Sequence, residues 1–515
     1  MLRKYGKGGN VRRIGFVILI LALVFAVGCG GSSSSTPSTP TTPTTPTTPT
    51  TTTVTSTPGG NTIAAAAINV APLIVNAGPV PSNPQVNVAF TTVTVCAPGS
   101  TSNCQTIPNI AVDTGSSGLR IPISVLNTAV LTQLSNVNPS TPVAECIQFL
   151  DNSFFFGTVR VADVRMGGPN GNGSGISNTE LASSVPIHVM GDTSIPTGSS
   201  IPTTCSQVPT GTGSKITGTE EDSVTALGAN GLLGVGNYQY DCDFIGYGNA
   251  CTSSSTLPPG TYYTCTGTSC SASAVPVSQQ VRNPVSKFPT DNNGVILELP
   301  AVTTGVGGLN VAGAMVFGIG TQTNNGLSSS AVVLPLDPTE TDPAWGGFTT
   351  VYNNVSYPNA AENNLLLANS GNTIGTVGSF LDSGSNAIFF LDQPTSGITD
   401  CSGTENFFYC PGSTESLTAY NQAAGSSVQS EVPFYVSNAL TLFSANGGNN
   451  TAFNDLTGPN TTGNPNSLTK AADGYFDWGL PFFYGRNVYT AIWGVTQPST
   501  PVSGVTVPAG PWWAY

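Results

Sequence analysis

The sequence predicts an all-β protein with few short helices, built from two related lobes. Only 8% of the 515 residues are charged, whereas glycine and proline number 60 and 40, a composition that favours short strands joined by turns. A loop of the form Asp-Thr/Ser-Gly-Ser occurs twice, at residues 113–116 and 382–385, each time between two apolar runs. Two such loops far apart predict that each lobe contributes one carboxylate to a shared site, although unrelated β-turns would use the same residue types.

Residues 1–28 have the features of a bacterial lipoprotein signal peptide. Five basic residues lie within the first 13 positions, and residues 14–27 form an apolar run that is short for a membrane span. Cys29 follows Ala26-Val27-Gly28, which resembles a site where cleavage makes the cysteine a lipid-bearing N-terminus. Ala26 replaces the usual leucine, and an ordinary signal peptide is the alternative. We expect a lipid-anchored protein of the bacterial cell envelope, either periplasmic or surface-exposed.

Residues 29–62 are expected to form a disordered stalk. A serine tract is followed by repeated Pro-Thr-Thr units, which offer little apolar surface to bury and favour an extended, solvated chain. The stalk would hold the folded body away from the membrane, and we assign it no catalytic role.

Ten of the eleven cysteines can be paired, which predicts an oxidising compartment. Connectivity does not follow from sequence alone, but short loop-closing bridges are favoured for most of them. The predicted disulfides are Cys96–Cys104, Cys146–Cys205, Cys242–Cys251, Cys265–Cys270 and Cys401–Cys410.

Charge and histidine content exclude several classes of function. Without the five basic residues of the signal peptide, eight basic residues face 26 acids, a formal charge of −18. Nucleic-acid binding is therefore not expected, because little would neutralise the phosphates. His188 is the only histidine, which excludes a multi-histidine zinc site and disfavours a serine hydrolase. Its apolar neighbours are typical of a strand.

The folded body is expected to divide into an N-terminal lobe, residues 63–322, and a C-terminal lobe, residues 323–515. Residues 86–96 have strand composition with partial alternation and lead towards the first aspartate loop. A Cys-rich stretch, residues 238–274, is expected to be an insertion in the N-terminal lobe.

The two loops resemble those of the pepsin-like aspartic peptidases, in which two lobes each present an Asp-Thr/Ser-Gly-Thr/Ser loop at a central cleft. The resemblance covers roughly residues 85–495, and a group of uncharacterised bacterial surface lipoproteins shares the pattern. It implies a two-lobed pepsin-like fold with a central cleft. It also implies a monomeric aspartic-type endopeptidase that acts on a polypeptide substrate without a metal or cofactor.

The resemblance also implies residue roles, which correspond between the lobes. Asp113 and Asp382 would form the catalytic dyad, and two carboxyls at such close range share a proton; aspartic proteases are a standard example of this behaviour. The supporting residues would be Ser116 and Ser385 on the outer carboxylate oxygens, Thr114 and Ser383 as a cross-link between the loops, Gly115 and Gly384 in the turns, and Gly234 and Gly479 in strands that buttress the loops.

Two positions depart from the family pattern. Phe156-Gly157-Thr158 stands where the family has the flap, a hairpin with a Tyr-Gly-Thr tip, and Arg120 replaces a tryptophan that bonds that tyrosine. These changes suggest a rebuilt contact in which Arg120 stacks on a phenylalanine and its charge lowers the pKa values of the dyad. An ordinary core strand is the alternative for Phe156. The rival function is a catalytically inactive, surface-anchored binding or structural module.

Overall fold

The computed structural model describes residues 52–55, 58–149, 151–171, 173, 179–209, 215–244, 248–253, 261–336, 347–357, 378–423, 426–460, 475–502 and 504–515. The predicted signal peptide, Cys29 and most of the predicted stalk lie outside these ranges. The following description applies to the part of the chain within them.

The predicted all-β class is confirmed, because strands dominate the described chain and its α-helices are short. These helices are α1 (Thr128–Leu131), α2 (Thr203–Ser206), α3 (Val224–Leu227), α4 (Gln393–Ser396) and α5 (Ala439–Ser444). Short 3-10 turns accompany them. None of the helices in the described ranges has the length and apolar character needed to cross a membrane.

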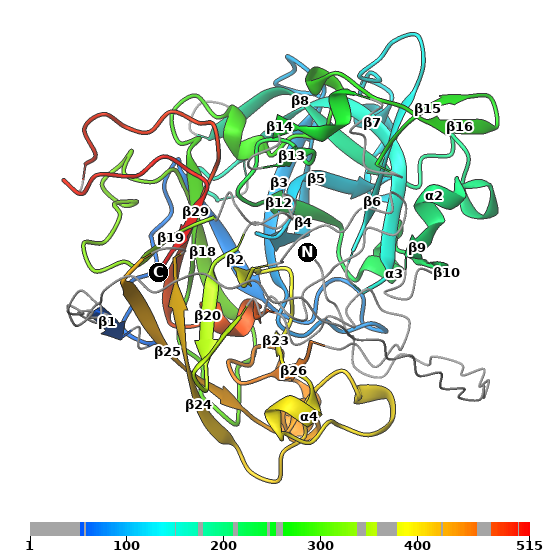
Figure 1. Ribbon diagram of the computed structural model, residues 1–515. Coiled ribbons are helices and arrows are strands. Elements are labelled where there is room, and N and C mark those ends of the chain that lie inside the picture. Colours follow the sequence, from blue (N-terminus) through cyan, green and yellow to red (C-terminus); the bar gives the residue numbers. More distant parts are fainter. Residues whose placement is uncertain are drawn as a thin grey trace, which may run out of the picture.

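The largest sheet has 16 strands, most of them from the first half of the chain (Figure 1). Its path runs through β16 (Ser269–Ala272), β15 (Tyr262–Thr266), β6 (Val143–Gln148), β7 (Ser153–Met166), β8 (Glu180–Met190), β5 (Ser117–Pro122), β12 (Gly231–Val235), β4 (Cys104–Asp113), β3 (Ala89–Cys96), β2 (Val70–Val75), β18 (Val311–Phe317), β17 (Gly294–Leu299), β28 (Arg486–Ala491), β29 (Trp512–Ala514) and β19 (Val333–Pro335), while β11 (Thr219–Glu220) pairs with β7. Strands from both sides of residue 322 therefore share one continuous sheet.

Two smaller sheets are built mainly from the second half of the chain, at the lower part of Figure 1. One contains β1 (Thr52–Thr55), β25 (Val428–Val436), β24 (Glu415–Gln422), β20 (Thr349–Tyr352) and β21 (Val355–Tyr357), and the other contains β22 (Phe380–Leu381), β27 (Asp477–Trp478), β23 (Ile388–Phe390) and β26 (Thr457–Pro459). Two short ribbons complete the described strands: β9 (Gln207–Pro209) with β10 (Lys215–Thr217), and β13 (Asp243–Phe244) with β14 (Gly248–Asn249).

Burial explains why these segments are strands. Every residue of β17 is buried, Glu298 included, as expected for a mostly apolar strand in the middle of a sheet. In β25, by contrast, alternate residues from Ser430 to Val436 are buried, the period-two pattern of a sheet with one covered face. One apolar cluster includes Val112, Leu297 and Phe390, so the core continues from one half of the molecule into the other.

The predicted stalk is wrong at its C-terminal end. β1 lies within residues 29–62 but pairs in parallel with β25, with Thr52 opposite Val428 and Thr55 opposite Glu431. Threonine and valine are good strand formers, and the edge of β25 offers backbone groups that need partners. Local composition predicts a solvated chain here, but the open sheet edge decides the conformation.

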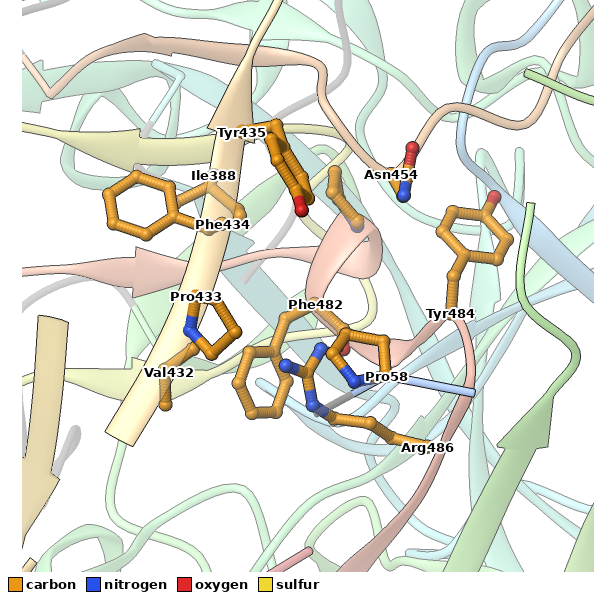
Figure 2. A pocket seen from close by; sticks show the side chains of 11 residues that line it. Pro58, Ile388, Val432, Pro433, Phe434, Tyr435, Asn454, Phe482, Tyr484 and Arg486 are labelled. Atoms are coloured by element: carbon orange, nitrogen blue, oxygen red, sulfur yellow. The ribbon is translucent and has the colours of Figure 1, made fainter. Parts of the chain in front are cut away.

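The residues after β1 also lie against the folded body. Pro58 lines a pocket beside Phe482 and Arg486 (Figure 2). The Asn61 side-chain amide donates to the carbonyl oxygens of Leu299 and Arg486, both at 3.0 Å. The chain therefore approaches the body along the second half of the molecule, and this pocket contains neither Asp113 nor Asp382.

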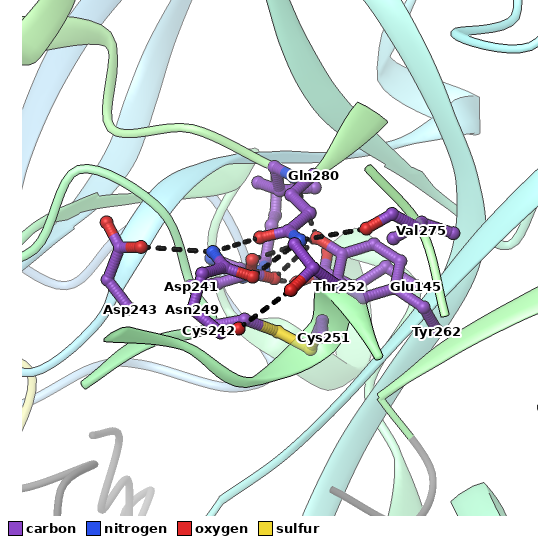
Figure 3. Close-up of a disulfide and its surroundings, with 12 residues drawn as sticks. Glu145, Asp241, Cys242, Asp243, Asn249, Cys251, Thr252, Tyr262, Val275 and Gln280 are labelled. Carbon is purple, nitrogen blue, oxygen red and sulfur yellow. Dashed lines mark hydrogen bonds and ion pairs between the residues drawn. A yellow bond between two sulfur atoms is a disulfide. The ribbon is translucent and has the colours of Figure 1, made fainter. Parts of the chain in front are cut away.

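Five disulfides join the cysteine pairs proposed from the sequence. The Cys-rich residues 238–274 extend the large sheet through β15 and β16, because β15 pairs with β6. Figure 3 shows the Cys242–Cys251 disulfide beside Asp241 and Tyr262. Part of this stretch therefore belongs to the large sheet, and Tyr262 within it is fully buried.

Candidate active site

The two aspartate loops have the same backbone setting. Asp113 is the last residue of β4, and β5 follows the loop; Asp382 follows β22, and β23 comes after its loop. A third strand lies between the two strands that flank each loop. β12 pairs in parallel with β4 and antiparallel with β5, and β27 pairs in the same way with β22 and β23. Each aspartate therefore lies at the end of a strand that is paired with this third strand.

The structure brings the two predicted dyad carboxyls together. The side chains of Asp113 and Asp382 share a hydrogen bond, and both residues are 0% exposed. A Cβ atom at Gly384 would lie 2.5 Å from Asp113 Oδ1 and 3.1 Å from Asp382 Oδ1. Glycine is therefore needed at this position, because any side chain would occupy the space where the carboxyls meet.

Each aspartate has matching hydrogen-bond donors in its own loop. The backbone N–H two residues later donates to Oδ1, and the serine hydroxyl three residues later reaches Oδ2. The distances are 2.8 Å from Gly115 N to Asp113, 2.5 Å from Ser116 Oγ to Asp113, 2.8 Å from Gly384 N to Asp382 and 2.9 Å from Ser385 Oγ to Asp382. Donors of this kind favour an ionised carboxylate.

Thr114 and Ser383 link the loops reciprocally. The Thr114 N–H donates to Ser383 Oγ at 3.1 Å, and the Ser383 N–H donates to Thr114 Oγ1 at 2.9 Å. Each hydroxyl then donates to a carbonyl of the opposite strand, Leu381 at 3.2 Å and Val112 at 2.9 Å. The position of one carboxyl is thereby fixed relative to the other.

Gly234 and Gly479 occupy equivalent places behind the loops. Gly234 lies opposite Asp113 in the β12–β4 ladder, and a Cβ there would approach the backbone of Ser116 to 2.6 Å. A Cβ at Gly479 would approach the carbonyl oxygens of Ala387 to 2.1 Å and Ser385 to 2.6 Å. Both loops pack against strand backbone at distances that exclude a side chain.

The surroundings of the two carboxyls differ. Burial raises the pKa of Asp382 well above its ordinary value, and the nearby carboxylates of Asp113 and Asp477 act in the same direction. Burial also opposes ionisation of Asp113, whereas its hydrogen bonds from Ser116 and with Asp382 act to lower the pKa of that carboxyl. Asp477, on β27, is a site residue that the sequence prediction missed.

The flap prediction is wrong in its position. Phe156, Gly157 and Thr158 lie inside β7, paired with β6 on one side and with β8 on the other. Phe156 is 2% exposed and its ring packs edge-on against Tyr263. The hairpin turn between β6 and β7 comes earlier, and Asn152, with φ of 67°, lies in it. The aromatic run is therefore core strand.

Among the described side chains, Arg120 does not make the predicted contact with a phenylalanine. It is 0% exposed, and its Nη2 lies 2.5 Å from Glu145 Oε1 and 3.7 Å from Asp241 Oδ2. His188 Nδ1 lies 2.7 Å from the other oxygen of Glu145. Burial disfavours ionised Glu145, but the charge of Arg120 lowers the pKa of that carboxyl. Arg120 therefore belongs to a buried ion cluster, where acids balance its charge.

The Cys-rich insertion completes this cluster (Figure 3). Asp241 accepts a hydrogen bond of 2.8 Å from the Tyr262 hydroxyl, which itself accepts the N–H of Val281 at 2.7 Å. Burial, followed by the charge of Glu145, raises the pKa of Asp241 well above its ordinary value. The Cys-rich stretch thus places Asp241 3.7 Å from the guanidinium of Arg120.

Comparison with known proteins identifies the family. A search of curated proteins gives no match. The structure is similar to the crystal structure of basic 7S globulin from soybean, with a TM-score of 0.40 and 12% sequence identity, over 82% of this chain and 93% of that chain. A family profile described as "Protein of unknown function (DUF3443)" matches residues 65–515, which include both aspartate loops. The chain therefore belongs to the DUF3443 family.

Proposed function

We propose that the protein is an aspartic-type endopeptidase that hydrolyses peptide bonds with a water molecule activated by Asp113 and Asp382. The observation that carries this proposal is the meeting of the two carboxyls, which share a hydrogen bond while each accepts a backbone N–H and a serine hydroxyl from its own loop. A pair of interacting carboxyls holds one proton over a range of pH, so one member can act as base while the other acts as acid.

The proposed reaction begins with ionised Asp113 and protonated Asp382. Asp113 takes a proton from the water, whose oxygen attacks the peptide carbonyl carbon, and Asp382 gives its proton to the carbonyl oxygen. In the resulting diol, Asp382 takes back one hydroxyl proton as the carbonyl re-forms. Asp113 passes its proton to the leaving nitrogen as the C–N bond breaks. Both carboxyls then have their starting protonation, and the mechanism requires no metal or cofactor.

A second candidate function, a catalytically inactive binding or structural module, is favoured by one specific observation. Both carboxyls are 0% exposed, so neither offers accessible surface to a substrate in this structure. Lids and loops that move to admit substrate are common in enzymes, whereas a module without activity has no need of such movement.

We test the choice with the chain from residue 30 onwards, which keeps β1 on its sheet edge. It is incubated with a denatured protein between pH 3 and 7, with and without pepstatin. We expect pepstatin-sensitive cleavage with a bell-shaped pH profile, and Asp113→Asn and Asp382→Asn should each abolish it without unfolding the chain. Variants that cleave like the parent would place the activity at another site. A folded parent that cleaves nothing would favour the binding module.

We also propose that Cys29 carries a lipid anchor, which ties the protein to the bacterial cell envelope. Five disulfides support an oxidising compartment. Cys29→Ala should release the protein from the membrane fraction or stop its maturation. A variant that remains bound to membranes with unchanged processing would contradict the anchor.

A further inference from the structure

The residues around the two aspartate loops can be compared position by position, because β12 and β27 pair in the same way with the strands that flank each loop. On β12, Leu232 lies opposite Ala111, two residues before Asp113, and opposite Arg120, seven residues after it. On β27, Asp477 lies opposite Phe380, two residues before Asp382, and opposite Phe389, seven residues after it. Asp477 is therefore the counterpart of Leu232, and the second half has a buried carboxyl where the first has an apolar side chain.

This difference changes what the loop serine can do. Ser385 Oγ lies 2.9 Å from Asp382 Oδ2 and 2.8 Å from Asp477 Oδ2. A serine hydroxyl has one hydrogen, so it can donate to only one of the two carboxylates at a time. In the first half, within the described residues, the hydroxyl of Ser116 donates to a single carboxylate, that of Asp113, at 2.5 Å.

We propose that Asp477 is a positioning residue that competes with Asp382 for the hydrogen bond of the Ser385 hydroxyl and so keeps Asp382 as the protonated member of the dyad. This inference rests on the proposed peptidase function and extends it by assigning the acid and base roles. Asp113 keeps its own serine donor and is the ionised base. Asp382 shares its serine donor with Asp477 and faces a second negative charge, and both effects favour its protonated form.

The charged groups around Asp382 are consistent with this assignment. Among the described residues, the titratable groups acting on it are Asp113, from β4, and Asp477, from β27; both carboxylates raise its pKa, after burial. Arg120, which lies in the position equivalent to Phe389, is balanced by Glu145 and Asp241. The cation that the sequence suggested would act on the dyad is thus held by other acids.

The test replaces Asp477 in the full-length chain by asparagine and, separately, by leucine, the residue at the equivalent position of the first half. Asp477→Leu removes both the negative charge and the competing acceptor, so Ser385 can donate to Asp382 throughout, whereas Asp477→Asn removes the charge and leaves an uncharged amide oxygen as acceptor. A charge within 4–6 Å typically shifts a carboxyl pKa by about 1–3 units, and we expect the upper pKa of the kcat profile to fall by about one unit. The alkaline limb of the activity profile should therefore move to lower pH.

A direct titration makes the test independent of turnover. Carboxyl carbons of ¹³C-labelled aspartate are followed by NMR, and the Asp382 signal is assigned by its loss in Asp382→Asn. In the parent it should titrate at higher pH than in Asp477→Asn and Asp477→Leu, even if the protein cleaves nothing, so failure of the peptidase function and failure of this inference remain distinguishable. Near-ultraviolet circular dichroism confirms that each variant is folded.

Ser385→Ala separates hydrogen-bond sharing from simple repulsion between charges. In that background no hydroxyl is shared, so the downward shift caused by Asp477→Leu should be smaller than in the parent background. An Asp382 carboxyl that titrates at the same pH in the parent and in both variants would overturn the proposal. An equal shift with and without the Ser385 hydroxyl would overturn the hydroxyl-sharing mechanism as well.

Discussion

Replacing Thr114 by valine removes one hydroxyl from the link between the loops and almost preserves the shape of the side chain. Thr114 Oγ1 accepts the Ser383 N–H at 2.9 Å and donates to the Leu381 carbonyl at 3.2 Å. Thr114 is 2% exposed and Ser383 is 1% exposed. Valine offers no acceptor and both residues are buried, so the Ser383 N–H loses its hydrogen bond without replacement.

The expected cost follows from these two bonds. Leaving a buried donor without an acceptor costs about 1–3 kcal/mol, and a lost hydrogen bond to a carbonyl costs about 0.5–1.5 kcal/mol. We therefore expect Thr114→Val to lower the free energy of unfolding by about 2–4 kcal/mol. The control is Thr114→Ser, which keeps the hydroxyl and loses one methyl group, at a cost of about 1 kcal/mol.

The assay is unfolding in guanidinium chloride without reductant, followed by tryptophan fluorescence, because Trp478 is buried on β27 beside the second loop. An unchanged slope with a lower midpoint identifies a loss of stability. Combining Thr114→Val with Ser383→Ala should cost clearly less than the sum of the single changes, because the two residues share their bonds. If the free energies of unfolding of Thr114→Val and Thr114→Ser differ by less than about 0.5 kcal/mol, the hydroxyl of Thr114 does not stabilise the fold through the cross-link.

Two further predictions concern buried charges outside the dyad. Arg120→Met leaves the buried carboxylate of Glu145 without its main partner, so the free energy of unfolding, measured by thermal unfolding, should fall by about 3–5 kcal/mol. Adding Glu145→Gln should recover part of this stability, because the unpaired charge is removed. No recovery would contradict the charge argument. Burial and then the charge of Asp291 raise the pKa of Glu180 from 4.5 to about 8, so the folded chain keeps a proton that the unfolded chain releases. The free energy of unfolding should then fall as pH rises from about 4.5 to about 8. Glu180→Gln should therefore be more stable relative to the parent at pH 8 than at pH 5. An equal difference in stability at both pH values would refute the raised pKa of Glu180.

The sequence predicted the parts of the site that depend on short-range pattern. Asp113 and Asp382 were found because each is the first residue of a four-residue loop between apolar runs, and the reciprocal roles of Thr114 and Ser383 came from the family resemblance. Most of the disulfides also join cysteines close in sequence. The hairpin turn carries a local signal too, because Asp151-Asn152 are turn residues, whereas the aromatic run after it resembles the family's flap but is core strand.

The remaining features depend on contacts between distant residues. Arg120 pairs with Glu145, 25 residues later, and with Asp241 from the insertion, and no local pattern links these three positions. Asp477 reaches Ser385, 92 residues away, only because β27 lies between β22 and β23. β1 forms because a sheet edge elsewhere accepts it. In each case the tertiary environment determines the contact, and local sequence motifs carry no information about it.

The difference between the two halves around the dyad also bears on whether the protein is a catalyst. The cross-link, the glycines and the loop serines correspond between the halves, and they would leave the two carboxyls in similar environments. Asp477, in the place of Leu232, breaks this symmetry at the dyad. Burying a third carboxyl beside two others costs free energy, and an apolar residue such as that of the first half would avoid the cost. A binding module gains nothing from this arrangement, whereas a dyad with one acid and one base requires its two members to differ.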